Sequence, residues 1–270
     1  MRDAPLIAIT HVPPRTLEKG ERTYVGRAPI DFSLALRQHG QYCALLGACG
    51  ARVTTLDANA AHADAVFVED TAIVLDEIAV MTSPGAVSRR PEIAGIEPEL
   101  RKYRRVARVE LPGTIDGGDV VVVGKRIFVG ASARSNEAGA RSLQTIVAQF
   151  GYHVDRVGLR DCLHLKSACC ALPDGRLLVN PAWLEGDALR DFTHVAIDPS
   201  EPFAADFATV GDTIIMSDTN PRTAAMVRQL GFTVRATPLS EFEKAEGGVT
   251  CLSIIFHAKP EVNDNATQRG

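Results

Sequence analysis

The chain has 270 residues, of which 46% are hydrophobic and 23% charged, the usual proportions of a globular protein with a buried core. Its 29 Lys and Arg against 33 Asp and Glu leave a formal net charge of −4 without any basic block, so we expect no nucleic-acid partner. Charged or small residues interrupt every apolar stretch well short of the about 20 residues that a bilayer span needs. No leader pattern opens the chain. We expect a cytoplasmic protein with no membrane contact.

The six cysteines have neither the paired C-x-x-C spacing of most zinc sites nor the density of a disulfide framework. One alternative joins Cys162 and His164 to Cys169 and Cys170 as zinc ligands. Neighbouring residues of a strand point to opposite faces, which argues against a shared role for Cys169 and Cys170. We therefore expect reduced thiols and no metal. No nucleotide- or phosphate-binding motif occurs, so we expect no cofactor.

Helix and strand signals alternate along the whole chain, which predicts an α/β fold. Good start or end signals mark four helices. These are residues 29–48, residues 92–103 with Ser88 as the capping candidate, a segment from Asn136 to Gly151, and a segment from Asn220 and Pro221 to Gly231.

Three of these helices end in the same way. Gly50, Gly151 and Gly231 each stand where a left-handed residue commonly terminates a helix, and a short strand-like run follows each one. The recurring helix, glycine and strand indicate an internal repeat.

A second recurring element is a polar segment that leads directly into a β-rich run, at spacings of 46, 48, 42 and 45 residues. The anchor residues are Asp70, Asp116, His164, Asp206 and Cys251. Any α/β chain alternates every 30 to 40 residues or so, but chance does not explain why reactive residue types recur at one place in each unit. The spacing predicts a closed ring of five modules whose matching positions converge on the axis. Because no linker divides the chain, we expect one domain over residues 1–258 and a polar tail over 259–270.

Three of the converging residues form a plausible catalytic set. Cys251 is a potential nucleophile if a neighbouring cation favours its thiolate. His164 can move protons near neutral pH, and Asp116 can orient the imidazole. Taken singly, each also has a structural interpretation, as a core thiol, a core histidine and a turn residue.

Acidic residues gather near a predicted strand start, where Asp64, Glu69 and Asp70 would be costly to bury without a cation. A planar guanidinium would satisfy several of them through paired hydrogen bonds. Arg89 and Arg134 could hold a carboxylate, although both groups could also be ordinary surface charges.

Seven segments, in this order and across nearly the whole chain, resemble the dimethylarginine dimethylaminohydrolases of the guanidino-group-modifying, or pentein, superfamily. They are Phe67–Thr71, Pro84–Arg90, Gly113–Asp119, Phe128–Gly130, Arg134–Asn136, Leu163–Ser167 and Gly247–Cys251. The resemblance implies a five-bladed α/β propeller with Cys251 as nucleophile, His164 as general acid and base, and Asp116 orienting the histidine.

The same resemblance implies how a substrate would be held. Glu69 and Asp70 would face its guanidinium, and Asp64 its α-amino group. Arg89 and Arg134 would bind its α-carboxylate. A mobile loop around Leu17 and Gly20 would cover the site, with Leu17 contributing its carbonyl.

The implied reaction is the hydrolysis of an Nω-methylated arginine to citrulline and a methylated amine through a covalent alkylthiouronium on Cys251. Two alternatives stay open. An Nω-hydroxyarginine hydrolase would use the same residues and release ornithine, and a pentein-fold binding protein would catalyse nothing. The sequence does not fix the number of subunits, and a homodimer stays open.

Overall fold

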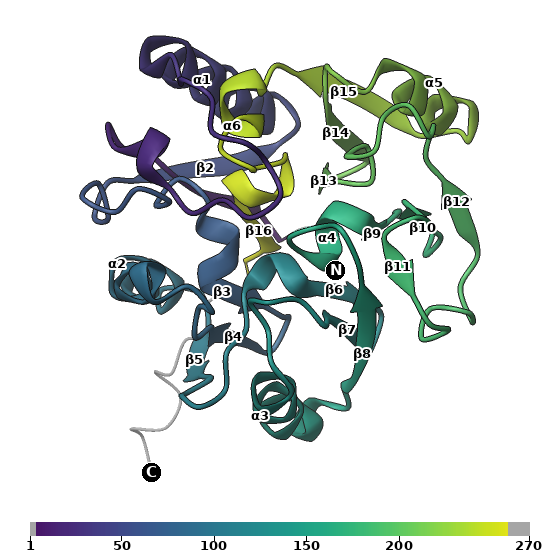
Figure 1. Ribbon diagram of the computed structural model, residues 1–270. Helices are drawn as coiled ribbons and strands as arrows, with labels where there is room; N and C mark the ends of the chain where they lie inside the picture. Colours follow the sequence, from purple (N-terminus) through teal and green to yellow (C-terminus); the bar gives the residue numbers. More distant parts are fainter. Residues whose placement is uncertain (1–3, 259–270) are drawn as a thin grey trace.

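The computed structural model describes residues 4–258, so the predicted tail at 259–270 lies outside the described residues. Within this part of the chain the strands form five small sheets (Figure 1). The sheets are numbered in the order in which neighbours pack together. The first contains β16 (Ile254–His257), β1 (Leu6–His11) and β2 (Ala51–Leu56), the second β3 (Ala72–Val74), β4 (Ile78–Met81) and β5 (Arg105–Arg108), and the third β6 (Val120–Val123), β7 (Arg126–Gly130), β8 (His153–Leu159) and β11 (Leu184–Glu185). The fourth contains β9 (Cys169–Ala171), β10 (Leu177–Val179) and β12 (His194–Ala196), and the fifth β13 (Phe207–Val210), β14 (Thr213–Ser217) and β15 (Thr233–Thr237).

All five sheets share one connectivity. An antiparallel pair is followed by a parallel partner of its second strand, as in β3–β4–β5 and β13–β14–β15. In the first sheet the antiparallel pair joins the two ends of the described chain, because β16 pairs with β1. The fold is mixed α/β, as predicted.

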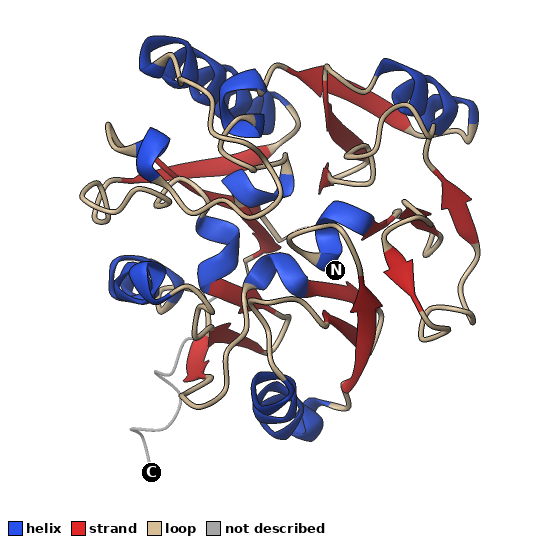
Figure 2. Cartoon of the chain, in the orientation of Figure 1, coloured by secondary structure: helices blue, strands red, loops and turns tan. Residues whose placement is uncertain are grey.

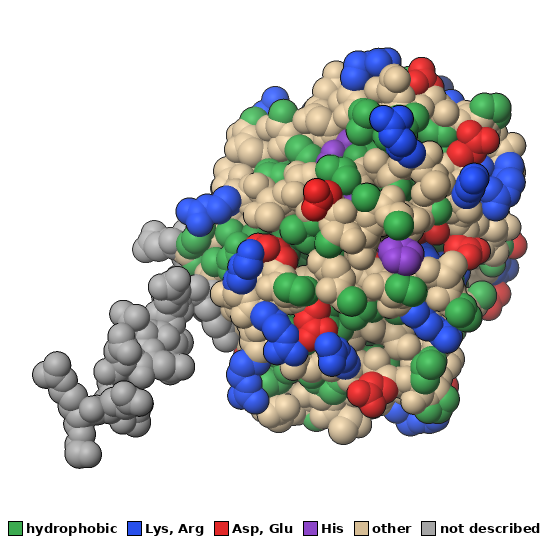
Figure 3. Space-filling model, turned by 90° about the vertical axis from the view of Figure 1, so that its left-hand side faces the viewer, with side chains coloured by type: hydrophobic (Ala, Val, Ile, Leu, Met, Phe, Trp, Pro, Cys, Tyr) green, Lys and Arg blue, Asp and Glu red, His purple; other side chains and the backbone are tan. Residues whose placement is uncertain are grey.

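Helices connect the parallel strands in four of the sheets and lie on the outside of the molecule (Figure 2). They are α1 (Phe32–Ala48), α2 (Ile93–Leu100), α3 (Glu137–Val147) and α5 (Pro221–Gln229), while the short α4 (Leu165–Ala168) and α6 (Ser240–Glu243) lie further in. No helix within residues 4–258 is both long enough and apolar enough to cross a membrane. On the face drawn in Figure 3, Lys and Arg side chains are scattered among Asp, Glu and apolar ones.

Each of five apolar clusters packs between two sheets. Val80 and Val129 belong to a cluster between the second and third sheets, and Cys170 and Phe207 to one between the fourth and fifth. A further cluster contains Ala8 of β1 and thus joins the fifth sheet to the first. Each sheet therefore packs against two neighbours.

The helix ends agree with the sequence in part. Asn136 caps α3 by accepting the Gly139 N–H at 2.8 Å, as predicted. Helix α1 begins at Phe32 rather than near residue 29, because the Asp31 side chain caps it through the Leu34 N–H. Gly50, Gly151 and Gly231 have φ values of 96°, 78° and 96°, in the left-handed region as expected.

The helix predicted at residues 92–103 starts one residue later than expected and ends three residues earlier, and Ser88 does not cap it. A 3-10 helix occupies Val87–Glu92, and the α-helix runs only from Ile93 to Leu100. Ser88 lies inside the 3-10 segment, where its hydroxyl donates to Glu21 instead of capping a helix. The local sequence is compatible with a cap, but a contact with a distant segment takes the hydroxyl.

The recurring polar segments are helical turns rather than strand starts. Four such turns precede β3, β6, β9 and β16: Val68–Thr71, Gly117–Asp119, α4 and Thr250–Leu252. After the anchor His164 the chain forms α4 (Leu165–Ala168), and the strand β9 begins only at Cys169.

These turns are linked by carboxylates from neighbouring modules. Backbone N–H groups at the start of a helical turn lack partners within the turn and are free to bind a side chain. Gly118 N donates to Asp70 at 2.9 Å, Leu165 N to Asp119 at 3.0 Å, and Thr250 N to Asp206 at 2.9 Å. A buried aspartate of one module thus fixes the turn of the next.

Candidate active site

The predicted catalytic residues come from the central turns of different modules. Asp116 precedes the turn Gly117–Asp119, His164 precedes α4, and Cys251 lies within the turn Thr250–Leu252. Because each turn directly precedes a strand of its own module, three segments that are distant in the sequence present side chains to one region. The sequence spacing predicted this convergence.

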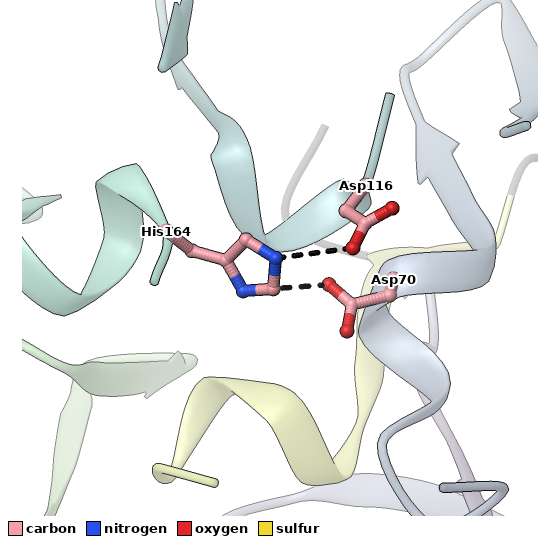
Figure 4. A group of neighbouring side chains, drawn as sticks. All are labelled: Asp70, Asp116 and His164. Atoms are coloured by element: carbon pink, nitrogen blue, oxygen red, sulfur yellow. Dashed lines mark hydrogen bonds and ion pairs between the residues drawn. The ribbon is translucent and has the colours of Figure 1, made fainter. Parts of the chain in front are cut away.

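His164 faces two carboxylates, those of Asp116 and Asp70 (Figure 4). Its Nε2 is 3.1 Å from Asp116 Oδ2, and its Nδ1 is 3.8 Å from Asp70 Oδ1. Asp116 is fully buried, and its second oxygen accepts the Gly85 N–H at 2.9 Å. The imidazole is therefore held in one orientation by a carboxylate that is itself fixed by the backbone.

These surroundings favour the charged imidazole. Burial alone would lower the pKa of His164, but the charge of Asp70 and the hydrogen bond with Asp116 raise that pKa to about 9. The thiol has the opposite preference. Burial, with the carboxylates of Asp206, Glu69 and Asp70, raises the pKa of Cys251 well above its ordinary value. The resting pair is an imidazolium beside a neutral thiol.

Arg89 is buried and already forms several contacts. It forms ion pairs with Asp70 and Glu92 and donates to the carbonyl oxygens of Phe67 and Asp64. Its Nε and Nη2 donors are used in these contacts, and one Nη1 hydrogen is left for a further acceptor. Arg89 therefore fixes Asp70 and retains capacity for one more hydrogen bond.

Arg134 is less engaged than Arg89. Within residues 4–258 its guanidinium forms one ion pair, in which Nη1 lies 3.6 Å from Asp116 Oδ2.

Asp64 accepts the Glu21 N–H at 3.1 Å, and burial raises the pKa of its carboxyl group. Gly20 approaches Asp64 so closely that a Cβ there would lie 2.3 Å from Oδ1.

The cavity at the site has a volume of only about 20 Å³, room for about one water molecule. Six of the nine predicted site residues line it: Asp64, Asp70, Arg89, Arg134, His164 and Cys251. Three do not. Asp116 lies behind His164, Glu69 faces another cavity, and Leu17 is buried with its carbonyl accepting the Gly20 N–H at 3.1 Å.

Glu69 lies on the far side of the site, on the wall of a second cavity of about 330 Å³. Lys166 Nζ lies 2.6 Å from its Oε1, and the Thr250 hydroxyl donates to its Oε2 at 2.7 Å. Glu69 is thus already paired with the ammonium group of Lys166. The sequence did not single out Lys166, although its place two residues after His164 was a usable signal.

Sequence reasoning also missed Glu246, which lines the small cavity beside Cys251. Its two carboxylate oxygens accept the N–H groups of Thr23 and Tyr24, at 2.5 and 2.8 Å. Glu246 has a φ of 64°, a left-handed conformation that is uncommon for a residue with a side chain. It attaches the segment around residues 17–27 to the loop that precedes Cys251.

One group of possible metal ligands occurs within residues 4–258, namely Asp70, Asp116 and His164, whose ligand atoms lie within 4.8 Å of one another. Ion pairs with Arg89 and Arg134 already compensate the two carboxylates. No cysteine joins this group. Cys169 and Cys170 belong to different apolar clusters, so they point apart and the zinc interpretation fails.

A partly buried cysteine, an imidazolium held by carboxylates, and two arginines around one cavity define a site of the guanidino-group-modifying, or pentein, class. Two curated proteins named N(G),N(G)-dimethylarginine dimethylaminohydrolase match the chain over 92% of its length. The one from Pseudomonas aeruginosa is 34% identical over 251 residues and covered to 98%, and the one from Streptomyces coelicolor is 38% identical over 248 residues and covered to 95%. The chain belongs to the dimethylarginine dimethylaminohydrolase family.

Solved structures agree with this assignment. A cysteine-to-serine mutant of the Pseudomonas aeruginosa enzyme in complex with citrulline matches with a TM-score of 0.86 at 33% identity, over 92% of this chain and 98% of that one. The N-terminal domain of the arginine dihydrolase ArgZ, at 22% identity and a TM-score of 0.83 over 93% and 97% of the two chains, shows the fold alone. No protein-family model matches the sequence.

Proposed function

We propose that this protein hydrolyses Nω-methylated L-arginine, with dimethylarginine giving L-citrulline and dimethylamine. The observation that carries the proposal is that one small cavity brings together a cysteine, a charged histidine, two buried carboxylates and two arginines. Family membership adds weight, since the curated relatives have this activity in their names.

Substrate binding is proposed residue by residue. Asp70 would accept hydrogen bonds from the guanidinium, with Glu69 behind it. Asp64 would accept from the α-amino group, and Arg89 and Arg134 would hold the α-carboxylate, chiefly through Arg134, because most donors of Arg89 are already used. Leu17 would contribute its carbonyl once its segment has moved to admit a substrate.

In the first stage, the Cys251 thiol loses its proton to solvent as the cationic substrate binds. The thiolate attacks the guanidinium carbon, and the C–N bond to the amine breaks. The imidazolium of His164 donates a proton to the departing amine, and Asp116 keeps the ring aligned. The product of this stage is a covalent S-alkylthiouronium cation on Cys251. Since the surroundings of Cys251 raise the pKa of its thiol, the positive charge of the substrate itself favours the thiolate.

In the second stage, neutral His164 takes a proton from water, whose oxygen attacks the thiouronium carbon. The C–S bond then breaks, which releases the ureido product and returns Cys251. All steps use residues of this chain, and the proposal requires no metal or organic cofactor.

The test offers asymmetric dimethylarginine and Nω-hydroxyarginine separately to the purified protein and identifies the amino-acid product. Citrulline from the methylated substrate supports the proposal. Ornithine from the hydroxylated one alone would move the activity to the alternative hydrolase, and no product from either would favour a binding role.

Cys251→Ser should abolish turnover and leave the fold intact, because a serine hydroxyl is a far weaker nucleophile here. Cys43→Ser is the matched control, since Cys43 lies on α1 and contacts Thr10 and His39 instead of the site. Near-normal turnover of Cys251→Ser would contradict the thiol mechanism.

We also propose that the five sheets are the blades of one pseudo-symmetric propeller that forms a single domain over residues 1–258. Their shared connectivity and the apolar clusters between them support this. A cytoplasmic location is consistent with six unpaired cysteines. Light scattering after size-exclusion chromatography would distinguish a monomer from a homodimer.

A further inference from the structure

Asp206 is a buried carboxylate that the proposed reaction does not use. It directly precedes β13, with its side chain against the turn that carries Cys251. Its Oδ1 accepts the Thr250 N–H at 2.9 Å, and its Oδ2 is 3.2 Å from Thr250 Oγ1. Its position matches those of Asp70 and Asp119, which fix the turns of their own neighbouring modules.

Asp206 differs from those two aspartates in the groups that stabilise its carboxylate charge. Asp70 has the guanidinium of Arg89, and Asp119 accepts hydroxyl hydrogen bonds from Ser132 and Ser135. Within residues 4–258, no Lys or Arg forms an ion pair with Asp206, because the nearby Lys166 is bound to Glu69. A buried carboxylate in this situation is costly to ionise.

The number of hydroxyl hydrogens on Thr250 indicates that Asp206 carries a proton. The single hydroxyl hydrogen of Thr250 cannot serve both Glu69 Oε2, at 2.7 Å, and Asp206 Oδ2, at 3.2 Å. Glu69 accepts this hydrogen at the shorter distance, and its ion pair with Lys166 favours its charged form against the burial that raises its pKa. Asp206 completes the network only as a neutral acid whose own O–H donates to Thr250 Oγ1. Burial and the charge of Glu69, which together raise the pKa of Asp206 to about 7, agree with this arrangement.

We propose that Asp206 is a positioning residue that holds the nucleophile turn as a neutral carboxylic acid and, when it loses its proton, opposes ionisation of the Cys251 thiol. This inference rests on the proposed role of Cys251. It assigns Asp206 the further role of setting the pH range in which the thiolate forms.

The packing makes this coupling direct. A Cβ on Gly248 would lie 2.4 Å from the Asp206 carboxyl group, so only glycine allows this approach. The Gly248 N–H in turn donates to Cys251 Sγ at 3.4 Å. Asp206, Gly248 and Thr250 thus pack together around the turn that carries the nucleophile.

Other titratable groups also face Asp206. Glu69 and Lys166 lie across Thr250, and Cys170 and Tyr42 lie close enough that the Asp206 charge raises the pKa of each. Asp206 also lines a cavity of about 360 Å³ together with Asp161, Glu201, Glu243 and Glu246. These neighbours are the same in the wild type and in a variant at position 206. A difference in Cys251 reactivity between the two proteins therefore reports the charge of Asp206.

The experiment measures the rate at which iodoacetamide alkylates Cys251, followed by mass spectrometry of its peptide, between pH 6 and pH 10 or so. In Asp206→Asn, which keeps an acceptor for Thr250 N and a donor for Thr250 Oγ1, the midpoint should fall by about one pH unit, because a like charge has been removed. Alkylation near pH 8 should become about tenfold faster. The control is Asp161→Asn, which removes a negative charge from the rim of the same cavity and should leave the midpoint unchanged.

An unchanged midpoint in folded Asp206→Asn would overturn the proposal, as would an equal shift in Asp161→Asn. Asp206→Ser, also uncharged, provides a second comparison. If neither neutral variant folds, the proposal is wrong as well, because a resting neutral acid should be replaceable by an uncharged hydrogen-bonding group. Alkylation needs no substrate, so this outcome is independent of whether dimethylarginine is turned over.

Discussion

The pairing of His164 with Asp116 makes a quantitative prediction for Asp116→Asn. The asparagine oxygen can still accept the Gly85 N–H, which places the amide nitrogen where Oδ2 now faces His164 Nε2 at 3.1 Å. A donor would then face the imidazolium donor. We expect the variant to fold and to disfavour the charged form of His164.

The size of the effect follows from the environment of the histidine. The pKa of about 9 lies some 2.5 units above the ordinary value of 6.5, equivalent to about 3 kcal/mol in favour of the imidazolium. Asp70, Asp116 and Asp119 share this effect, and only Asp116 makes a hydrogen bond to the ring. Its loss should lower the pKa by at least about one unit, so that the roughly tenfold excess of imidazolium near pH 8 falls to about parity.

The assay is the pH dependence of kcat/KM for citrulline formation, which reports the free enzyme. In wild type the alkaline limb should fall near pH 9, and in Asp116→Asn near pH 8 or below. The control is Asp155→Asn, which removes the carboxylate of an exposed pair in which His153 Nε2 lies 3.2 Å from Asp155 Oδ1. An alkaline limb that stays in place in Asp116→Asn would refute the assigned role of His164 as the proton donor.

Two further predictions concern stability and the covering segment. The pKa of Glu92 is raised to about 7 in the folded protein, so protonated Glu92 stabilises the fold at low pH, and this stabilisation is lost as the pH rises from about 4 to 7. The pKa of His164 is raised to about 9, so its stabilisation is complete below pH 6.5 and is lost as the pH rises to about 9. The melting temperature should therefore fall between pH 5 and pH 9, and a steady rise over that range would contradict these shifts. Glu246→Gln leaves one acceptor for the N–H groups of Thr23 and Tyr24, so trypsin should cleave residues 15–27 several-fold faster at unchanged melting temperature. Equal cleavage of both proteins would show that Glu246 does not hold the segment.

The sequence predicted the α/β fold and the convergence of Asp116, His164 and Cys251, because both depend on local patterns that repeat. Left-handed glycines such as Gly151 and caps such as Asn136 act within a few residues of themselves, so their signals can be read directly. The repeat carried the rest of the prediction.

Contacts between distant segments could not be predicted in this way. Ser88 has the chemistry of a helix cap, but its hydroxyl is bound by Glu21, 67 residues away. Lys166, 97 residues away in the sequence, forms an ion pair with Glu69, so a carboxylate expected to face the guanidinium of the substrate is already paired with a cation of the chain. The helical turns before the strands were missed for the same reason, since carboxylates such as Asp119 from neighbouring modules stabilise them.

The charge distribution explains why a bound substrate should favour ionisation of the thiol of this site near neutral pH. Internal cations already compensate the carboxylates around the cavity, Arg89 for Asp70 and Arg134 for Asp116. The imidazolium of His164 is held by the same carboxylates, so little positive charge remains to stabilise a thiolate at Cys251. A guanidinium that enters the cavity brings the missing charge directly to the sulfur. Selectivity for a cationic substrate then arises from the ionisation of the nucleophile itself, in addition to any hydrogen bond that the substrate makes.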